Sequence, residues 1–295
     1  MIKDYLEEHG FYSDEKSFRD LTTIRMGGPI AHYVEPFSRE DLLDIIRTLK
    51  AQHIPFKVIG NGSNLICGES AFDGVVISLK KFNEFEIEND KVRVEAGVLC
   101  PYLSAVLAKE GLSGFEFASA IPGNIGGLLY MNAGAYKSDM SAVVEEVEVL
   151  RRDEIVTLKN DELDFSYRHS IFQDHPHWVI LSAVLHLEKK DPSEIQALMA
   201  DRLERRKATQ PLDKLSAGSC FRNPEGDYAW KLIDGIGYRG LRRNDISVSA
   251  KHSNFIVNEG KGRSDDYLSI VYDIIDKVKE KYGIDLVMEV EKFNC

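Results

Sequence analysis

The stretch that decides the fold reads Ile121-Pro122-Gly123-Asn124-Ile125-Gly126-Gly127. It lies at the centre of residues 111–136, which carry six glycines but few charges. A flexible linker would be polar, whereas this segment also contains large apolar residues such as Phe115 and Phe117. Glycines among apolar residues favour a backbone that packs tightly against a flat or anionic ligand. The alternative is a glycine-rich crossing with a purely structural role.

A second glycine loop stands upstream and reads Gly60-Asn61-Gly62-Ser63-Asn64. It follows a predicted strand over 56–59, and successive backbone N–H groups in such a loop can form a concave phosphate site. It is not the Rossmann fingerprint, because Leu65 occupies the position of the third glycine. Taken alone, the loop is more typical of a structural turn. The 111–136 segment shifts the interpretation towards a ligand site.

Helices and strands are predicted along the whole chain, without a regular βαβ alternation. Apolar spacing and capping residues predict helices over 38–49, 102–110, 191–207, 228–233 and 265–282. Alternating or continuous apolar runs predict strands over 56–59, 75–79, 91–95, 144–150, 154–158, 179–187, 254–258 and 285–290. Ser38 and Ser264 are the expected N-caps of two of these helices, and Gly283 is expected to end the last one. The pattern predicts the α+β class.

Composition narrows the possible partners and compartments. The 295 residues carry a net charge of −11, and an acidic surface disfavours a broad nucleic-acid or anionic-membrane footprint. The first ten residues are polar and acidic, unlike a secretory signal, and no apolar run is long enough to cross a bilayer. The four cysteines are far apart and form no C-x-x-C pair, which indicates reduced cytoplasmic thiols with neither a zinc site nor disulfides. We expect a cytoplasmic protein with no metal.

The sequence closely resembles the UDP-N-acetylenolpyruvoylglucosamine reductase family over nearly the whole chain. No single block decides the resemblance, but the blocks occur together and in the family's order. They are Thr22–Gly28, Gly60–Leu65, Ile121–Gly127 with Met131–Tyr136, Tyr167–Phe172, Gln210-Pro211 with Ala217–Pro224, and Ala250–Asn258.

The resemblance implies a two-domain flavoenzyme. Residues 1–207 are expected to form a two-lobed FAD-binding domain of the vanillyl-alcohol-oxidase-like (PCMH) type, split near residue 70. Residues 208–295 are expected to form a smaller α+β substrate domain, whose last strand is a candidate to pack back on the first lobe. The implied cofactor-binding residues are Arg25, Gly60, Asn61, Gly62, Ser63, Asn64, Ile121, Pro122, Gly123, Asn124, Gly126, Gly127, Asn132, Gly134, Ala135 and Tyr136.

The reaction implied by the resemblance belongs to peptidoglycan precursor synthesis. NADPH is the co-substrate, FAD is bound non-covalently, and UDP-N-acetylglucosamine enolpyruvate is reduced to UDP-N-acetylmuramate. The cofactor carries the redox chemistry, and the protein supplies geometry and electrostatics. The expected protein is a monomer that binds neither nucleic acid nor a membrane.

Three catalytic residues are carried over from the family. Arg168 is implied to bind the substrate carboxylate, because an always-charged planar fork suits that group. Ser219 is the implied proton donor, and Glu289 the implied acid that polarises the carboxylate. Without the family blocks, a salt bridge is the simpler interpretation of Arg168, a turn or cap of Ser219, and a solvated strand edge of Glu289.

The C-terminal block departs from the family pattern, because the usual Pro and Arg around Glu289 are replaced by Met288 and Glu291-Lys292. Residues 289 and 291 share a face in a regular strand, so spacing alone does not separate Glu289 from Glu291.

Residues near the catalytic candidates are expected to bind substrate. Tyr167, Arg222 and Asn223 have this expected role, with Arg222 and Asn223 near the UDP diphosphate. Cys220 is interpreted as a buried small apolar residue rather than a reactive thiol. Only 51 positions separate Arg168 from Ser219, which resembles the family's second subtype without the substrate-covering loop.

Two other functions remain open from the residues. One is a different FAD enzyme on the same fold, such as a hydroxy-acid dehydrogenase or an oxidase with covalent flavin. No histidine lies near Gly60–Asn64 in sequence to suit a covalent link. The other is a non-catalytic nucleotide-sugar-binding protein, which the presence of Arg168, Ser219 and a C-terminal glutamate disfavours.

Overall fold

The computed structural model describes residues 2–295 and divides them into two compact units. The first unit comprises described residues 2–13, 32–61 and 74–205. The second comprises residues 14–31, 62–73 and 206–295. The division after residue 205 lies near the boundary expected at 207, but two N-terminal segments also fold with the C-terminal residues. The glycine loop at 60–64 is therefore shared, since Gly60 and Asn61 belong to one unit and Gly62–Asn64 to the other.

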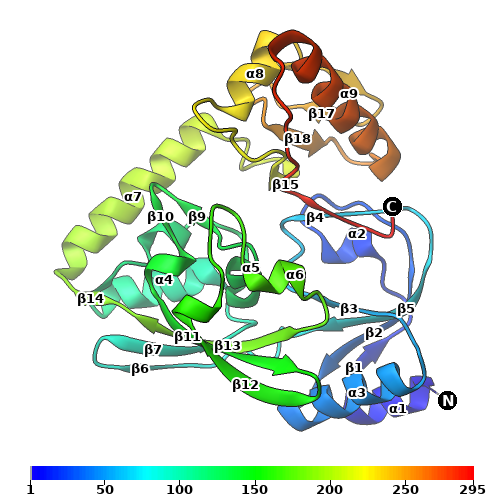
Figure 1. The fold of residues 1–295 in the computed structure, drawn as a ribbon, viewed down its shortest axis with the longest axis vertical. Coiled ribbons are helices and arrows are strands. Elements are labelled where there is room, and N and C mark those ends of the chain that lie inside the picture. The colour runs from blue at the N-terminus through cyan, green and yellow to red at the C-terminus, as the bar shows by residue number, and fades with distance from the viewer. Residues whose placement is uncertain (1) are drawn as a thin grey trace. The chain divides into compact units, whose positions relative to one another are not determined.

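A four-stranded sheet and two helices form one part of the first unit (Figure 1). Its strands follow the order β1 (Gly10–Ser13), β2 (Ile30–Pro36), β5 (Phe72–Ser78) and β3 (Phe56–Ile59), with α1 (Ile2–His9) and α3 (Arg39–Ala51) as its helices. The Ser38 hydroxyl accepts a hydrogen bond from the Asp41 N–H, as predicted for the N-cap of α3. The apolar face of α3 is buried through Leu42, Ile45, Ile46 and Leu49.

A five-stranded antiparallel sheet forms the other part of the first unit. Its order is β12 (Glu154–Lys159), β11 (Val144–Arg151), β13 (Val179–His186), β7 (Lys91–Glu95) and β6 (Phe85–Glu88). The strands predicted over 144–150 and 154–158 form a hairpin: Arg151 pairs with Glu154, and the turn consists of Arg152 and Asp153, whose φ angles are +50° and +68°. Two central residues with positive φ give the tight turn whose twist suits a hairpin.

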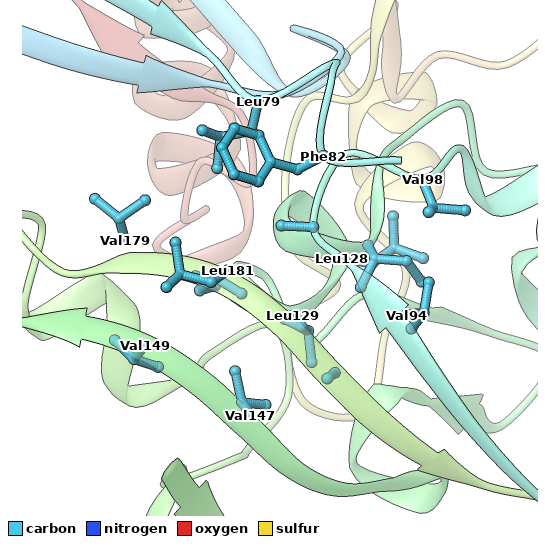
Figure 2. Packing of buried hydrophobic residues seen from close by; sticks show 14 of the residues in the cluster. Leu79, Phe82, Val94, Val98, Leu128, Leu129, Val147, Val149, Val179 and Leu181 are labelled. Atoms are coloured by element: carbon cyan, nitrogen blue, oxygen red, sulfur yellow. The ribbon is translucent and has the colours of Figure 1, made fainter. Parts of the chain in front are cut away.

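The short helix α5 (Ile125–Tyr130) covers this sheet and brings the glycine-rich stretch to it. Figure 2 shows Leu128 and Leu129 of α5 among Val94, Val147 and Leu181, which come from three neighbouring strands. All five side chains are buried, and each is expected to contribute about 1.5–3 kcal/mol relative to an exposed position. The burial of α5 thus fixes where the preceding Ile121–Asn124 loop leaves the sheet.

The remaining elements of the first unit are short, apart from two helices. Helix α4 (Cys100–Lys109) ends before Gly111, whose φ of +67° lies in the left-handed region that favours glycine. Helix α7 begins after Asp191, whose carboxylate accepts from the Ser193 N–H. The other elements are β8 (Leu112–Ser113), η1 (Glu116–Ala118), β9 (Gly134–Ala135), β10 (Ser138–Asp139), η2 (Met140–Ala142), η3 (Asn160–Glu162), α6 (Ile171–Asp174), β14 (Glu188–Lys189) and α7 (Pro192–Thr209).

The second unit has its own sheet and its own core. The sheet order is β15 (Leu215–Ser219), β18 (Phe255–Asn258), β17 (Ile246–Val248) and β16 (Arg242–Arg243), and the helices are α2 (Phe18–Leu21), α8 (Ala229–Gly235) and α9 (Ser264–Tyr282). Helix α9 buries Tyr267, Ile270, Val271, Ile274 and Val278. It ends at Gly283 as predicted, with φ of +70°, but its N-cap is Arg263 rather than Ser264, which is already helical. Both units mix helices and strands, which confirms the α+β class.

The predicted final strand over 285–290 is wrong. Only Met288 in this range makes a bridge, with Phe221. The last strand is β19 (Glu291–Phe293), which runs parallel to β4 (Leu65–Cys67). The two elements are remote in sequence, and the local apolar pattern that suggested a strand at 285–290 carries no information about this partner.

Candidate active site

The two glycine segments meet in the first unit. The Asn61 side-chain Nδ2 donates to the Pro122 carbonyl oxygen at 2.8 Å. A Cβ built on Gly60 would lie 3.4 Å from Asn124 Oδ1, so Gly60 packs directly on that side chain. The structure thus brings together Gly60, Asn61, Pro122 and Asn124, four of the residues expected to bind the cofactor.

Asn124 anchors the glycine-rich stretch through one end of its side-chain amide, and the other end has no hydrogen-bond partner in the described part of the chain. It is the N-cap of α5 and is 4% exposed. Its Nδ2 donates to the Gly97 carbonyl oxygen, whereas its Oδ1 is buried and has no hydrogen-bond partner among residues 2–295. A buried amide oxygen without a partner costs about 1–3 kcal/mol, so Asn124 is a polar group whose burial the protein alone does not compensate.

Much of the backbone in this stretch is already engaged. The N–H groups of Gly123, Ile125 and Gly126 donate to the carbonyl oxygens of Ile121, Val98 and Ala96. These donors are not available to a phosphate, contrary to the simple picture of a loop that wraps an anion with all its N–H groups. Gly127 differs, because a Cβ there would meet nothing within 4 Å and the residue is exposed.

The rest of the first glycine loop lies in the second unit. Gly62 has a φ of +61°, and its carbonyl oxygen accepts from the Thr23 N–H at 3.2 Å. The Asn64 side chain donates to the Glu289 carbonyl oxygen at 3.0 Å, and the Asn64 carbonyl accepts from the Glu291 N–H at 2.9 Å. Asn64 therefore fixes the segment that carries both candidate glutamates.

Arg25 also belongs to the second unit. It has a φ of +55° and an exposed side chain, and its N–H donates to the Thr22 carbonyl oxygen at 3.1 Å. The Asn258 side chain donates to the carbonyl oxygen of the neighbouring Ile24 at 2.9 Å. This tight turn leaves the Arg25 guanidinium pointing to solvent, where an anionic ligand can reach it.

The side chains of Asn132 and Tyr136 form hydrogen bonds with backbone groups of the protein itself. Asn132 is 1% exposed, donates to the Ser166 carbonyl oxygen at 2.9 Å and accepts from the Ser141 N–H at 3.0 Å. The Tyr136 hydroxyl donates to the Arg202 carbonyl oxygen at 2.8 Å. Both ends of the Asn132 amide thus bind the protein itself.

Arg168 lies in a tight turn of the first unit. Ser166 and His169 exchange two backbone hydrogen bonds, with Tyr167 and Arg168 between them. Arg168 has a φ of +59°, which is unfavourable for a residue with a side chain by about 1–2 kcal/mol. Its Nη2 donates to the Gly134 carbonyl oxygen at 2.7 Å, and its guanidinium lies 5.1 Å from the Tyr167 ring centroid. The turn is held because Gln173 Nε2 donates to the Arg168 carbonyl oxygen at 3.0 Å.

Ser219 and Glu289 come from two segments that pair in the second unit. The Glu289 N–H donates to the Cys220 carbonyl oxygen at 2.8 Å, and the Arg222 N–H donates to Val287 at 2.9 Å. The β15–β18 ladder shifts register between Ser216 and Ser219, where Gly218 has a φ of +80°. This bulge changes the direction of the strand just before Ser219. Both side chains are partly exposed, so a ligand can reach them.

The residues expected around Ser219 have different environments. The Asn223 Oδ1 accepts from the Ala229 N–H at 3.1 Å and so caps α8. Cys220 is fully buried, and burial raises the pKa of its thiol to about 12, which confirms that it is a packed apolar residue. Arg222 is partly buried, and Tyr167 is 52% exposed.

One group of potential metal ligands occurs among residues 2–295. The ligand atoms of Asp164, His169 and Asp174 all lie within 4.8 Å of one another. The His169 Nε2 lies 3.6 Å from Asp164 and 3.3 Å from Asp174. Both carboxylates are largely exposed, which is typical of a surface ion pair.

Two side chains that support the site were not among the predicted site residues. Gln173 supports the Arg168 turn, and Asn254 binds the backbone of Phe221 through both ends of its amide. Asn254 lies in a block that carried the family resemblance, but its partner is 33 positions away. No local sequence signal identifies such a pairing.

Both the N-terminal and the C-terminal part of the chain are similar to known proteins. A family model described as an FAD binding domain matches residues 30–158, and one described as the C-terminal domain of UDP-N-acetylenolpyruvoylglucosamine reductase matches residues 210–293. The reductase of Caldanaerobacter subterraneus subsp. tengcongensis is 42% identical over 98% of this chain and 96% of its own length. That of Bacillus velezensis is 39% identical over 96% and 94%.

A solved structure agrees with the sequence relatives. The crystal structure of the UDP-N-acetylenolpyruvylglucosamine reductase from Thermus caldophilus has a TM-score of 0.82 and 34% identity, and the match covers 96% of this chain and all of that one. The match over nearly full length, together with two family models in the same order, shows one relationship. The chain belongs to the UDP-N-acetylenolpyruvoylglucosamine reductase family.

Proposed function

We propose that this protein reduces the enolpyruvyl ether of UDP-N-acetylglucosamine enolpyruvate to UDP-N-acetylmuramate, a step in peptidoglycan precursor synthesis. The observation that carries the proposal is the pairing of the segment after Ser219 with Val287–Glu289. It holds a hydroxyl and a carboxyl on neighbouring backbones, both partly exposed. The reaction requires such groups, because reduction of the double bond needs a proton as well as a hydride.

FAD fits the residues of the first unit. The unpartnered Asn124 Oδ1 is a buried acceptor beside Gly60, and FAD carries ribityl and ribose hydroxyls that can donate to it. Gly127 leaves open space at the edge of the same stretch. When bound, FAD supplies the hydride chemistry between NADPH and the substrate. The cofactor roles of the remaining loop residues are part of the same proposal.

Arg168 binds the substrate carboxylate in this proposal. Hydride addition at the terminal carbon leaves negative charge on the carbon next to the carboxylate, and fixed positive charge stabilises it. A guanidinium can bind a carboxylate through two parallel hydrogen bonds. The strained turn supports this role, because backbone strain of this kind is retained where surrounding contacts hold a functional side chain in place.

Ser219 donates the proton to that carbon, and Glu289 polarises the carboxylate. A serine hydroxyl is a weak acid, so its role depends on placement and on its neighbours. We assign the acid to Glu289 rather than Glu291, because the Glu289 backbone is hydrogen-bonded to Cys220, the residue after Ser219. Tyr167, Arg222 and Asn223 bind the substrate in this proposal. The Asn223 Oδ1 already accepts from the Ala229 N–H of α8, so its side-chain amide nitrogen is the group that we assign to the substrate.

The finer partners and the compartment belong to the same proposal. NADPH is the proposed co-substrate, and the protein is proposed to be a cytoplasmic monomer of the subtype without a substrate-covering loop. The net charge of −11 supports the absence of nucleic-acid and membrane partners. Among residues 2–295, no helix combines the length and the apolarity that a membrane crossing requires.

The test separates the two half-reactions. The purified protein is loaded with FAD, reduced anaerobically with NADPH and then mixed with the enolpyruvyl substrate while the flavin absorbance is followed. Ser219→Ala is expected to leave flavin reduction intact and to slow substrate-dependent reoxidation about 100- to 10,000-fold, the usual contribution of a positioned proton donor. Ser216→Ala, three positions earlier in β15, is the matched control and is expected to reoxidise normally.

Each failure has a distinct meaning. A protein that stays colourless with added FAD contradicts the flavoenzyme assignment. A yellow protein that oxidises NADPH at the same rate with and without the substrate is a different flavoenzyme or a binding protein. If Ser219→Ala reoxidises as fast as the unaltered protein, Ser219 is not the proton donor.

A further inference from the structure

Asn254 precedes β18 and binds the chain beside Ser219. Its side chain is 4% exposed, and both ends of its amide bind Phe221. Its Nδ2 donates to the Phe221 carbonyl oxygen at 2.8 Å, and its Oδ1 accepts from the Phe221 N–H at 3.0 Å. The Asn254 carbonyl oxygen also accepts from the Cys220 N–H at 2.7 Å. One residue thus makes three hydrogen bonds to a two-residue segment.

These hydrogen bonds extend the β15–β18 ladder beyond its last regular pair. The regular β15–β18 pairing ends where Ser219 pairs with Phe255. Beyond that point the Asn254 amide offers one donor and one acceptor, as a strand neighbour does. Phe221 is 1% exposed, so without Asn254 its N–H and carbonyl groups would be buried and unpaired.

The opposite edge of the same segment holds Glu289. The bridge between Phe221 and Met288 is flanked by the bonds from Glu289 to Cys220 and from Arg222 to Val287. Phe221 therefore turns its own N–H and carbonyl groups away from Met288 and towards Asn254. The segment from Cys220 to Arg222 is held from both sides, and the two candidate catalytic residues of this unit depend on it.

We infer that Asn254 is a positioning residue that sets the placement of Ser219 relative to Glu289. This inference rests on the proposed proton-donor role of Ser219. Ser219 follows a bulge and is the last residue of β15 that pairs with β18, so its placement depends on the anchored residues after it as well as on that pair. Asn254 acts through the backbone and contacts no reacting atom.

Asn254→Asp is the decisive variant, because its chemistry changes with pH. An ionised carboxylate accepts from the Phe221 N–H but cannot donate to the Phe221 carbonyl oxygen, whereas a protonated carboxyl does both. Burial raises the pKa of such a group. At alkaline pH the variant is expected to reoxidise with substrate about 10- to 100-fold more slowly than the unaltered protein, since small displacements of reacting groups have effects of this size.

The expected signature is recovery at acid pH with flavin reduction by NADPH unchanged throughout. Reoxidation is expressed as the ratio to the unaltered protein at each pH. Ser253→Ala is the matched control: Ser253 is fully buried and donates to the Trp230 carbonyl oxygen at 2.7 Å, and its loss leaves the Phe221 bonds in place. Its ratio is expected to stay constant with pH.

A second measurement tests the same bonds without catalysis. Amide hydrogen exchange of peptides that contain Phe221 is expressed as the ratio to the unaltered protein at the same pH. In Asn254→Asp this ratio is expected to exceed one at alkaline pH and to return towards one at acid pH. Wild-type-like reoxidation and exchange in Asn254→Asp, or equal loss of both half-reactions at every pH, would overturn the inference. An unaltered protein that is not reoxidised by the substrate overturns the proposed function instead, and with it any catalytic meaning of Asn254.

Discussion

Gly62 lies at a φ of +61°, and a Cβ built there would lie 2.0 Å from the Leu21 carbonyl oxygen. An alanine at this position meets both the left-handed backbone penalty and a clash with backbone that cannot rotate away. Gly62→Ala is therefore expected to lower the free energy of unfolding by about 2–5 kcal/mol, measured by urea denaturation. The loop geometry at 62 is thus required by the protein itself, before any ligand binds.

Gly226 is the matched control. It has a φ of +76°, but a Cβ there would meet nothing within 4 Å. Gly226→Ala is expected to lose only the backbone term, about 1–2 kcal/mol. Equal losses at 62 and 226 would mean that the close approach to Leu21 does not matter.

The sequence predicts the roles of some residues but not of others. Arg168 and Ser219 could be selected as candidates because they stand in recognisable blocks, although their roles remain proposals. The engagement of Asn132 with Ser166, and of Asn254 with Phe221, could not be predicted. An asparagine side chain donates and accepts equally well in many settings, and its partner is chosen by the tertiary fold.

At the level of elements, local signals predicted helices α3, α4, α7, α8 and α9, but they missed α1, β1 and β2 and most of the short strands. Ser38 and the apolar spacing after it fixed the position of α3, and strands β3 and β7 have the predicted bounds. The C-terminal strand was misplaced because β19 exists only through its pairing with β4, more than two hundred positions away. Short strands made by remote pairing have no periodicity of their own to reveal them.

Phe293 shows what holds β19 in place. Its ring lies 5.4 Å from Phe18 and 5.1 Å from Phe72, in edge-to-face contacts. Phe293→Ala is expected to lower the free energy of unfolding by about 2–4 kcal/mol, somewhat less than for a fully buried phenylalanine. Thermal and urea unfolding measure the loss. Phe11→Ala, at a ring that is 51% exposed, is the control, and a similar loss there would show that the aromatic cluster adds nothing.

At the level of the whole molecule, each unit has its own hydrophobic cluster. One runs from Leu6 to Leu187 within the first unit, and the other joins Ile24, Met26 and Ile66 to residues 217–290. A single boundary in the sequence could not describe this arrangement. Segments 14–31 and 62–73 contain apolar residues, but these do not indicate which core they complete, so their membership is visible only in the fold.

Both cores contain buried groups that the folded protein keeps neutral. Burial raises the pKa of Cys100 and Tyr33 in the first unit, and of Tyr267 and Cys220 in the second, where Cys220 reaches about 12. In the unfolded chain these groups ionise near their ordinary values, about 9 for cysteine and 10 for tyrosine. Above that range the unfolded state therefore binds fewer protons than the folded state.

Because the unfolded state loses these protons first, the free energy of unfolding falls as the pH rises. Stability is fully present below about pH 8 and is lost as pH rises, with a slope that approaches about 1.4 kcal/mol per pH unit for each such group. Urea unfolding followed between about pH 8 and about pH 10.5 measures the slope. Cys220→Ala removes one of the groups, so its unfolding free energy is expected to fall less steeply above about pH 9 even if its absolute value is lower. A free energy that stays constant across the range, or an identical slope in Cys220→Ala, would contradict the burial of these groups as neutral species.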